Sequence, residues 1–274
     1  LVHAAVLFPG DILGGYGLAG LLMLALLPLS DRGLLTWAAV FTVPVVVFGS
    51  TYGLATGAGG PRGLSASDPW EATILRLVEW LAATPFTALV VLLPMVLGLW
   101  AGRRRILEEP ERHPVLLRRA AVAGLTLALI GGLPLDLVVA GALPSSTPTI
   151  NLVYGALHTL TGVAGGLGYA ALVGLLVIRL RSRGALGPVT AAVAACGERS
   201  LSCYLAQSVV FVLLFTPYAG GLGLQLGSAA TAVVALLTWL ATVAGASVLE
   251  RLGRRGPAEV LLRSLTYRGL RVNS

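Results

Sequence analysis

Seven long apolar stretches constrain this chain more than any other feature of its sequence. They approach or exceed the roughly 20 apolar residues that cross the core of a bilayer, and they cover residues 12–29, 34–50, 80–101, 116–139, 151–178, 188–216 and 229–249. Because lipid offers no partner for unpaired backbone groups, each stretch is predicted to be an α-helix. They are too long and too uniformly apolar to be barrel strands. The predicted fold is all-α, a polytopic transmembrane helix bundle with seven full spans.

The composition excludes several broad classes of protein. Hydrophobic residues make up 56% of the 274 residues, charged residues only 11%, and the mean hydropathy is +0.87. Soluble proteins average roughly 25% charged residues, so a soluble enzyme and a disordered chain are both excluded. The net charge of +7 comes with arginines in short runs between apolar blocks. This placement is typical of membrane proteins, so the lipid bilayer is an expected partner and nucleic acid is not.

The arginines predict the orientation of the spans. Sixteen of them fall on one side of the seven predicted spans: Arg32, Arg103, Arg104, Arg105, Arg112, Arg118, Arg119, Arg179, Arg181, Arg183, Arg251, Arg254, Arg255, Arg263, Arg268 and Arg271. The loops on the opposite side contain only Arg62 and Arg76. Since cytoplasmic loops are enriched in basic residues, the C-terminus is predicted to be cytoplasmic and Asp11 to lie near the outer surface.

The chain is predicted to be a single membrane-embedded domain, 1–274. Residues 1–8 are too short to span and resemble the end of a longer helix, so an N-terminal part is expected to be missing. Residues 51–79 form an external loop in which Asp68-Pro69-Trp70-Glu71 begins a helix, with Asp as N-cap and Pro at the first position. We expect this helix to lie on the membrane surface before the third span. Residues 251–274 form the cytoplasmic tail.

Polar side chains near the outer surface are the first candidate site. Asp11 is either a helix cap or part of an acidic site facing an external cavity together with His3 and Tyr16. His158 is a lone histidine about two turns from the outer end of the fifth predicted span. A lone histidine is commonly a hydrogen-bonded interior residue, but its pKa range also permits a general base. Asp136, at the outer end of the fourth span, is close enough in the topology to meet it.

The densest polar cluster lies within the sixth predicted span. Ser200, Tyr204 and Gln207 fall on one helical face with Cys203, and Glu198 and Arg199 precede them. Gly197 is a predicted break, after which a new helix would present its positive end to an anion. The alternative is an interhelical hydrogen-bond and salt-bridge cluster that holds the bundle together.

The cytoplasmic tail contains a predicted amphipathic helix. Pro257 fits its first position, and Glu259 and Arg263 are spaced as an i,i+4 pair. This helix either lies on anionic lipid or forms a fixed plug or binding site at the base of the bundle.

Several other motifs have simple interpretations. Cys196 and Cys203 would be ~10.5 Å apart along a continuous helix, too far for a disulfide. Gly15-Tyr16-Gly17-Leu18-Ala19-Gly20 matches a dinucleotide pattern but lies within a span. Helix packing through small residues is the favoured interpretation there and for the Gly162 and Gly166 spacing. No metal site and no tightly bound cofactor are expected.

Three stretches taken in order resemble one family. They are Gly10-Asp11-Ile12-Leu13 with Tyr16, the segment 197–208 (GERSLSCYLAQS), and Gly256-Pro257-Ala258-Glu259 through Arg263-Ser264-Leu265-Thr266-Tyr267. Together they resemble the YeiB-like bacterial membrane proteins, a domain of unknown function (DUF418). Cys203, Ala258 and Val260 depart mildly from that pattern. The resemblance implies a multi-pass protein of the bacterial inner membrane, and it includes a remote similarity to transmembrane acyltransferases.

Two functions and a structural role follow from these observations as hypotheses. As an acyltransferase, the protein would bind an anionic donor from the cytoplasm, such as acyl-CoA, through Arg199 and the helix starting near Ser200. His158, or Asp11 with His3, would act as general base towards an envelope or exported acceptor. As a transporter or efflux component, the same groups would line a path for a small molecule. As a scaffold, their role would be structural. The sequence leaves the substrate and the oligomeric state open.

Overall fold

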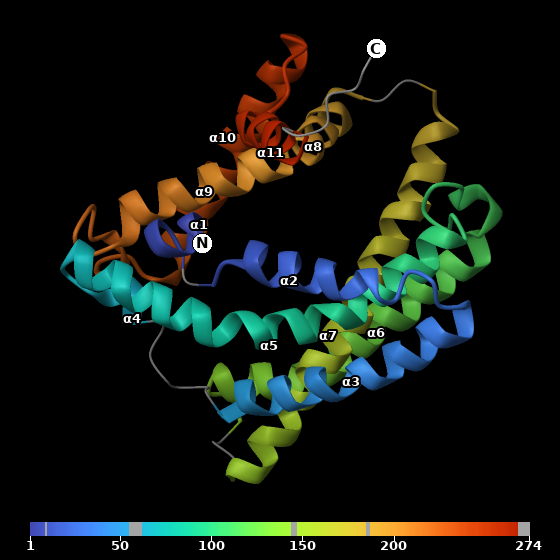
Figure 1. The fold of residues 1–274 in the computed structure, drawn as a ribbon, viewed down its shortest axis with the longest axis horizontal. Coiled ribbons are helices and arrows are strands. Elements are labelled where there is room, and N and C mark those ends of the chain that lie inside the picture. Colours follow the sequence, from blue (N-terminus) through green and yellow to red (C-terminus); the bar gives the residue numbers. More distant parts are fainter. Residues whose placement is uncertain (9, 55–61, 144–146, 185–186, 268–274) are drawn as a thin grey trace. The chain divides into compact units, whose positions relative to one another are not determined.

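A computed structural model describes residues 1–8, 10–54, 62–143, 147–184 and 187–267, and these residues form helices without a strand (Figure 1). The α-helices are α1 (Val2–Val6), α2 (Ile12–Leu24), α3 (Asp31–Leu54), α4 (Arg62–Ser65), α5 (Pro69–Arg103), α6 (Pro114–Val139), α7 (Pro148–Arg181), α8 (Pro188–Glu198), α9 (Ser200–Phe215), α10 (Ser228–Arg251) and α11 (Pro257–Thr266). Two short 3₁₀ helices, η1 (Pro110–Arg112) and η2 (Leu222–Leu224), lie in connections. The predicted all-α fold is confirmed.

Five helices in the described part of the chain are long and apolar enough to cross a membrane. They are α3, α5, α6, α7 and α10. The sixth predicted span is instead the pair α8 and α9, which bend by 84° at their junction. The first predicted span is a helix of only 13 residues, α2, and Pro28 has no N–H to donate to the carbonyl oxygen of Leu24, the last residue of that helix. The structure thus supports a membrane protein with five or six spanning helices and does not confirm the predicted seven.

Prolines mark many of the helix starts. Pro114, Pro148, Pro188 and Pro257 occupy the first turns of α6, α7, α8 and α11, where the missing N–H has no intrahelical partner to lose. At the start of α5, the Asp68 carboxylate accepts the Glu71 N–H at 2.8 Å, as expected for an N-cap. α5 then runs for 35 residues through Pro85 and Pro94. The predicted surface helix and the third predicted span are therefore one continuous helix.

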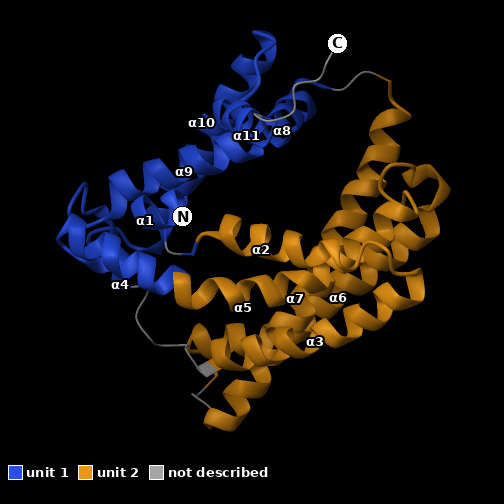
Figure 2. Cartoon of the chain, viewed as in Figure 1, with its two compact units in different colours: residues 1–10, 60–80, 185–274 blue, residues 11–59, 81–184 orange. Residues whose placement is uncertain are grey.

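The chain divides into two compact units (Figure 2). Unit 1 consists of Leu1–Gly10, Gly60–Trp80 and Ala185–Ser274, and unit 2 of Asp11–Gly59 and Leu81–Gly184. In unit 2, α7 packs against both α3 and α6. Leu34, Val45, Leu92 and Val96 contribute to the buried core that α3 and α5 share with α2.

Glycines permit the close approach of α7 to its neighbours. A Cβ added to Gly155 would lie 2.1 Å from the Gly49 carbonyl oxygen, and one added to Gly124 would lie 2.3 Å from the Ala164 carbonyl oxygen. At Gly162 and Gly166, an added Cβ meets no atom of the described residues within 4 Å. The predicted packing role of that pair is therefore not seen, since other glycines make the contacts.

In the glycine motif of α2, too, only some of the glycines lie against a neighbouring helix. An added Cβ at Gly15 would lie 2.7 Å from the Thr87 side chain. At Gly17 and Gly20 it meets nothing within 4 Å among the described residues. Only the first glycine of the motif thus makes a close helix contact.

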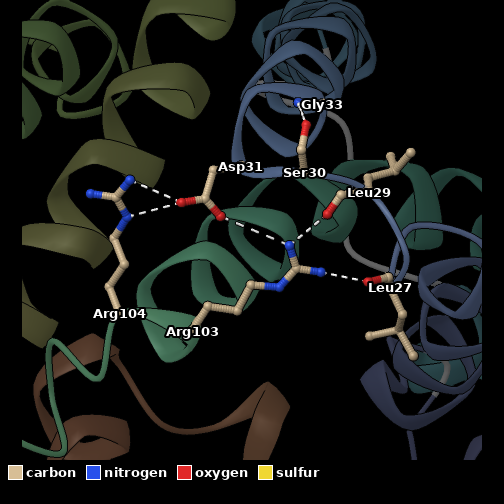
Figure 3. A network of polar contacts seen from close by, with 7 residues as sticks. All are labelled: Leu27, Leu29, Ser30, Asp31, Gly33, Arg103 and Arg104. Atoms are coloured by element: carbon tan, nitrogen blue, oxygen red, sulfur yellow. Dashed lines mark hydrogen bonds and ion pairs between the residues drawn. The ribbon is translucent and has the colours of Figure 1, made fainter.

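A polar network joins the end of α5 to the turn before α3 (Figure 3). Arg103 donates from its two terminal nitrogens to the carbonyl oxygens of Leu29 (2.6 Å) and Leu27 (2.5 Å). Asp31 lies 2.9 Å from Arg104 and 3.8 Å from Arg103. Arg103 thus binds carbonyl groups of the connection between α2 and α3, and Asp31 pairs with both arginines.

In unit 1, a buried arginine connects distant segments. The Arg76 side chain donates to the carbonyl oxygens of Gly63 and Val6, both at 2.9 Å, and to the Tyr218 hydroxyl at 2.5 Å. Arg76 is 1% exposed. A buried charge without partners is costly, so Arg76 requires these bonds. They tie α1, α4 and the loop after α9 to α5.

Candidate functional site

Arg199 occupies the break between α8 and α9. Its backbone angles (φ −117°, ψ 28°) are not helical, so it ends one helix and precedes the next. The break predicted at Gly197 is present, two residues later. The two helices then diverge, which allows the Arg199 side chain to turn towards α10 and the turn that follows it.

Every nitrogen of the Arg199 guanidinium is hydrogen-bonded within unit 1. Nε and Nη2 donate to the Arg254 carbonyl oxygen (3.1 and 2.8 Å), Nη1 to that of Ala195 (3.1 Å), and Nη2 also to Glu250 Oε2 (2.6 Å). Glu198 lies 3.6 Å from Nη1. The side chain is only 6% exposed. Arg199 therefore joins α8, α10 and the residue 254 turn, and donor binding by this guanidinium would require some of these bonds to open.

The carboxylate of Glu259 binds at the start of α9, where the sequence predicted an anion site. Glu259 of α11 accepts the Ser202 N–H at 3.0 Å and the Ser202 hydroxyl, and that hydroxyl accepts the Ala258 N–H at 2.9 Å. Burial opposes ionisation of Glu259, but the hydrogen bonds from Ser202 and the backbone outweigh it and hold the pKa of this carboxyl below its ordinary value of 4.5. A carboxylate at a helix N-terminus is electrostatically favourable.

The predicted Glu259–Arg263 pair is replaced by other contacts. Glu259 binds the start of α9, and the Arg263 guanidinium lies 5.6 Å from the centre of the Tyr267 ring. α11 thus contacts α9 through its first turn, and its amphipathic character agrees with the sequence prediction.

The side chains of the polar face predicted on α9 have three different environments. Ser200 is exposed. The Tyr204 ring contacts the His3 ring at a tilt of 36° with centroids 4.9 Å apart, and the His3 Nε2 atom lies 3.0 Å from the Ser208 hydroxyl. Gln207 donates to Thr242 Oγ1 on α10 at 3.1 Å. Tyr204 and Gln207 still line one pocket together with Ser208, and Ser200 is not among its lining residues, so a joint binding role for the predicted face stays a prediction.

Asp11 has the geometry of a helix cap. Its carboxylate accepts the N–H groups of Leu13 (3.2 Å) and Gly14 (2.9 Å) at the start of α2, and the residue is 5% exposed. Tyr16 is 48% exposed. His3 belongs to unit 1 and Asp11 to unit 2, so their joint action as a base stays a prediction.

His158 and Asp136 come together in unit 2, on α7 and α6. The Nδ1 atom of His158 lies 3.8 Å from Asp136 Oδ1, and the two side chains are 37% and 65% exposed. The Tyr52 ring stacks on His158 at a centroid distance of 6.1 Å. An added Cβ at Gly132 would lie 3.4 Å from His158 Nδ1 and 3.6 Å from Asp136 Oδ2, so the glycine leaves room between them.

This pair has the composition of a general base with an orienting carboxylate. A separation of 3.8 Å is too long for a hydrogen bond, and catalytic contacts in unliganded enzymes are often long and tighten in the substrate complex. No group of three or more His, Cys, Asp or Glu that could hold a metal ion is found among the described residues. The chemistry available from the pair is proton transfer.

Sequence reasoning missed several polar residues that matter to the structure. Ser202, Glu250 and Arg254 complete the contacts of Glu259 and Arg199, and Ser208 pairs with His3. Arg76 was assigned only to an outer loop. Ser202 and Ser208 belong to the polar segment 197–208, and this membership is the sequence feature that points to them. For Glu250 and Arg254 the contact depends on how α10 packs, which spacing does not encode.

Comparison with known proteins gives one family and one relative. Residues 101–269 match the family described as "Protein of unknown function (DUF418)". The "Uncharacterized protein YxaH" of Bacillus subtilis (strain 168) is 26% identical over 297 residues, which cover 97% of this chain and 68% of that protein. No solved structure matches the chain.

Proposed function

Because this chain belongs to the DUF418 family of proteins of unknown function, we propose a function from its geometry: acyl transfer at the membrane, with His158 as general base and Asp136 as its orienting carboxylate. The observation that carries the proposal is the placement of the imidazole 3.8 Å from the carboxylate, with both side chains partly open. The remote similarity to transmembrane acyltransferases supports the choice of reaction as an analogy.

The proposed reaction needs one proton acceptor near the acceptor substrate. A hydroxyl or amine attacks the carbonyl carbon of an acyl thioester such as acyl-CoA, and His158 takes the proton that this nucleophile loses. The thiol of the donor leaves with a proton as the new ester or amide forms. Asp136 stabilises the imidazolium that forms. General base catalysis by a positioned side chain typically raises the reaction rate 10²–10⁴-fold.

The proposal assigns Arg199 a structural role. A donor-binding guanidinium needs free donors, whereas this one is bonded through all three nitrogens and is 6% exposed. The start of α9 is likewise occupied by Glu259. We therefore place the proposed chemistry at the His158–Asp136 pair.

The proposed location is the bacterial inner membrane, with the C-terminus in the cytoplasm. The support is the arginine asymmetry between the two sets of loops. Asp136 lies near the end of α6 and His158 near the start of α7, so both belong to the end that the asymmetry places outside. The acceptor would then be an envelope or exported molecule.

Transport is the second candidate, and the same pair favours it. Ionisable residues within spanning segments commonly form proton relays, and His158 and Asp136 could load and release a proton during transport of a small molecule. This candidate requires no covalent product, which separates it from acyl transfer.

The test uses the purified chain in liposomes with labelled acyl-CoA and an envelope extract as acceptor. The expected result is transfer of label that falls at least about 100-fold in His158→Gln and substantially in Asp136→Asn. His113→Gln is the matched control, since His113 lies before α6 and away from the pair. Full transfer by His158→Gln would contradict the proposal, and substrate flux without a labelled product would favour transport.

A further inference from the structure

An apolar groove runs along α9 and α10 within unit 1. It has a volume of about 910 Å³, and Ala206, Val210 and Leu214 line it on α9, with Leu237, Ala241 and Gly245 on α10. Ser202 to Leu214 covers about 18 Å of helix rise, slightly more than the roughly 15 Å depth of one leaflet's hydrocarbon. The groove therefore has the length and surface that suit one acyl chain.

Two polar residues lie at one end of the groove. Arg199, Ser202 and Pro257 line it there, and Arg199 holds the Arg254 carbonyl oxygen, which fixes the turn between α10 and α11 beside this end. Gly253, with φ of 62°, allows the turn. The groove thus ends where the chain leaves the last spanning helix.

Three arginines lie at the end of α10 and in this turn. Arg251, Arg254 and Arg255 are exposed, and their guanidinium groups form no hydrogen bond or ion pair within the part of the chain that the structure describes. α11 follows directly with exposed apolar residues that include Leu261 and Leu265. Basic clusters beside a spanning helix attract anionic lipid headgroups, and guanidinium groups bind phosphate in a bidentate manner.

We propose that this groove and the three arginines form a binding site for an anionic glycerophospholipid. One acyl chain occupies the groove between α9 and α10, and the phosphate lies at Arg251, Arg254 and Arg255. The apolar walls accept any alkyl chain of suitable length, so selectivity comes from the charge of the headgroup. The site is separate from the proposed acyl-transfer pair, and its occupancy does not depend on that reaction.

The test measures retention of dioleoyl phosphatidylglycerol and dioleoyl phosphatidylcholine by the purified full chain, using native mass spectrometry. We expect the anionic lipid to be retained at least about tenfold more strongly. The variant Arg251→Gln/Arg254→Gln/Arg255→Gln should lose this preference. The control Arg118→Gln/Arg119→Gln/Arg183→Gln removes the same charge from exposed arginines of unit 2 and should keep it.

A second pair of variants tests the groove. Gly245→Phe fills it from a position where an added Cβ meets nothing within 4 Å, and Gly98→Phe is the matched control at an equally open glycine of α5. Phosphatidylglycerol should be lost from the first and kept by the second, and glycerol phosphate without chains should not compete. Equal retention of both lipids, equal loss in both arginine variants, or competition by the chainless phosphate would overturn the proposal. Dimer cross-links abolished by Gly245→Phe with lipid retention unchanged would also overturn it.

Discussion

At the scale of the residue, the buried arginines show how this protein accommodates charge within an apolar chain. Arg76 and Arg199 are 1% and 5% exposed, yet each is surrounded mainly by carbonyl oxygens. Arg199 adds one close carboxylate, Glu250, at 2.6 Å. Because lipid cannot solvate an unpaired charge, such side chains hold several backbone segments together at once.

Removing the Arg199 guanidinium should destabilise unit 1. In Arg199→Met, Glu250 and the Arg254 and Ala195 carbonyl groups lose their donor, and we expect a loss of about 3 kcal/mol in the free energy of unfolding. Arg254→Met is the control, because only its backbone takes part in the network. Denaturant unfolding in detergent measures both variants, and equal stability of the two would contradict a structural role for Arg199.

The contact of Glu259 with α9 should depend on pH. Its pKa in the folded protein is held below the ordinary value of 4.5 by the bonds from Ser202, so the ionised form stabilises docking. This contribution is fully present above pH 4.5 and is lost as the pH falls through the lower folded-state pKa. Anisotropy of a fluorophore at Ser264→Cys, with Cys196 and Cys203 replaced by serine, should fall on acidification as α11 is released. Glu259→Gln should show low anisotropy at neutral pH, and high anisotropy there would be evidence against the contact.

At the scale of the element, the sequence predicted helix starts at Pro69 and Pro257, an N-cap at Asp68 and a break of the sixth span near Gly197, and it gave a helix cap as one of two alternatives for Asp11. It did not predict the direction taken after the break. A continuous helix would separate Cys196 and Cys203 by ~10.5 Å, but their sulfur atoms are 3.6 Å apart. The expected separation was wrong because α8 and α9 bend by 84° between the two thiols.

The bend predicts an oxidation product. The two cysteines are free, and their proximity should allow diamide to convert them into an intramolecular disulfide, with S–S near 2.05 Å and with the diazene reduced to a hydrazine. Intact-protein mass spectrometry should show the loss of two hydrogen atoms and no alkylation by maleimide. Two thiols that remain open to alkylation after treatment would instead support a continuous helix.

Helix packing in unit 2 should depend on particular glycines. Gly155→Leu places a side chain against α3, where a Cβ would already lie 2.1 Å from the Gly49 oxygen, and should cost about 3 kcal/mol. Gly162→Leu, on the same helix, faces open space and should change stability by less than about 0.5 kcal/mol. Thermal unfolding compares them. The sequence motif favours the opposite order, because spacing alone does not show which face of α7 meets a neighbour.

At the scale of the whole molecule, composition and the long apolar stretches were sufficient to predict an all-α membrane protein, and three short motifs were sufficient to identify its family. The number of spans could not be predicted from the sequence, because α2 ends early and the sixth predicted span bends. The candidate site was predictable only as a list of residues. Asp136 and His158 meet because α6 and α7 pack through Gly124 and Gly131, whereas the face proposed on α9 divides among α1, α10 and the exposed surface.

From the arginine asymmetry, we expect the His158–Asp136 pair and the C-terminal tail with α11 to lie on opposite sides of the membrane. Labelling with a membrane-impermeant maleimide tests this arrangement most directly, using Ala142→Cys and Ser264→Cys in a chain without its native cysteines. Ala142 follows α6 near Asp136, and Ser264 lies on α11. We predict that position 142 is labelled in intact cells and position 264 only after permeabilisation. Labelling of position 264 from outside would contradict the orientation and, with it, the assignment of His158 to an outer reaction site.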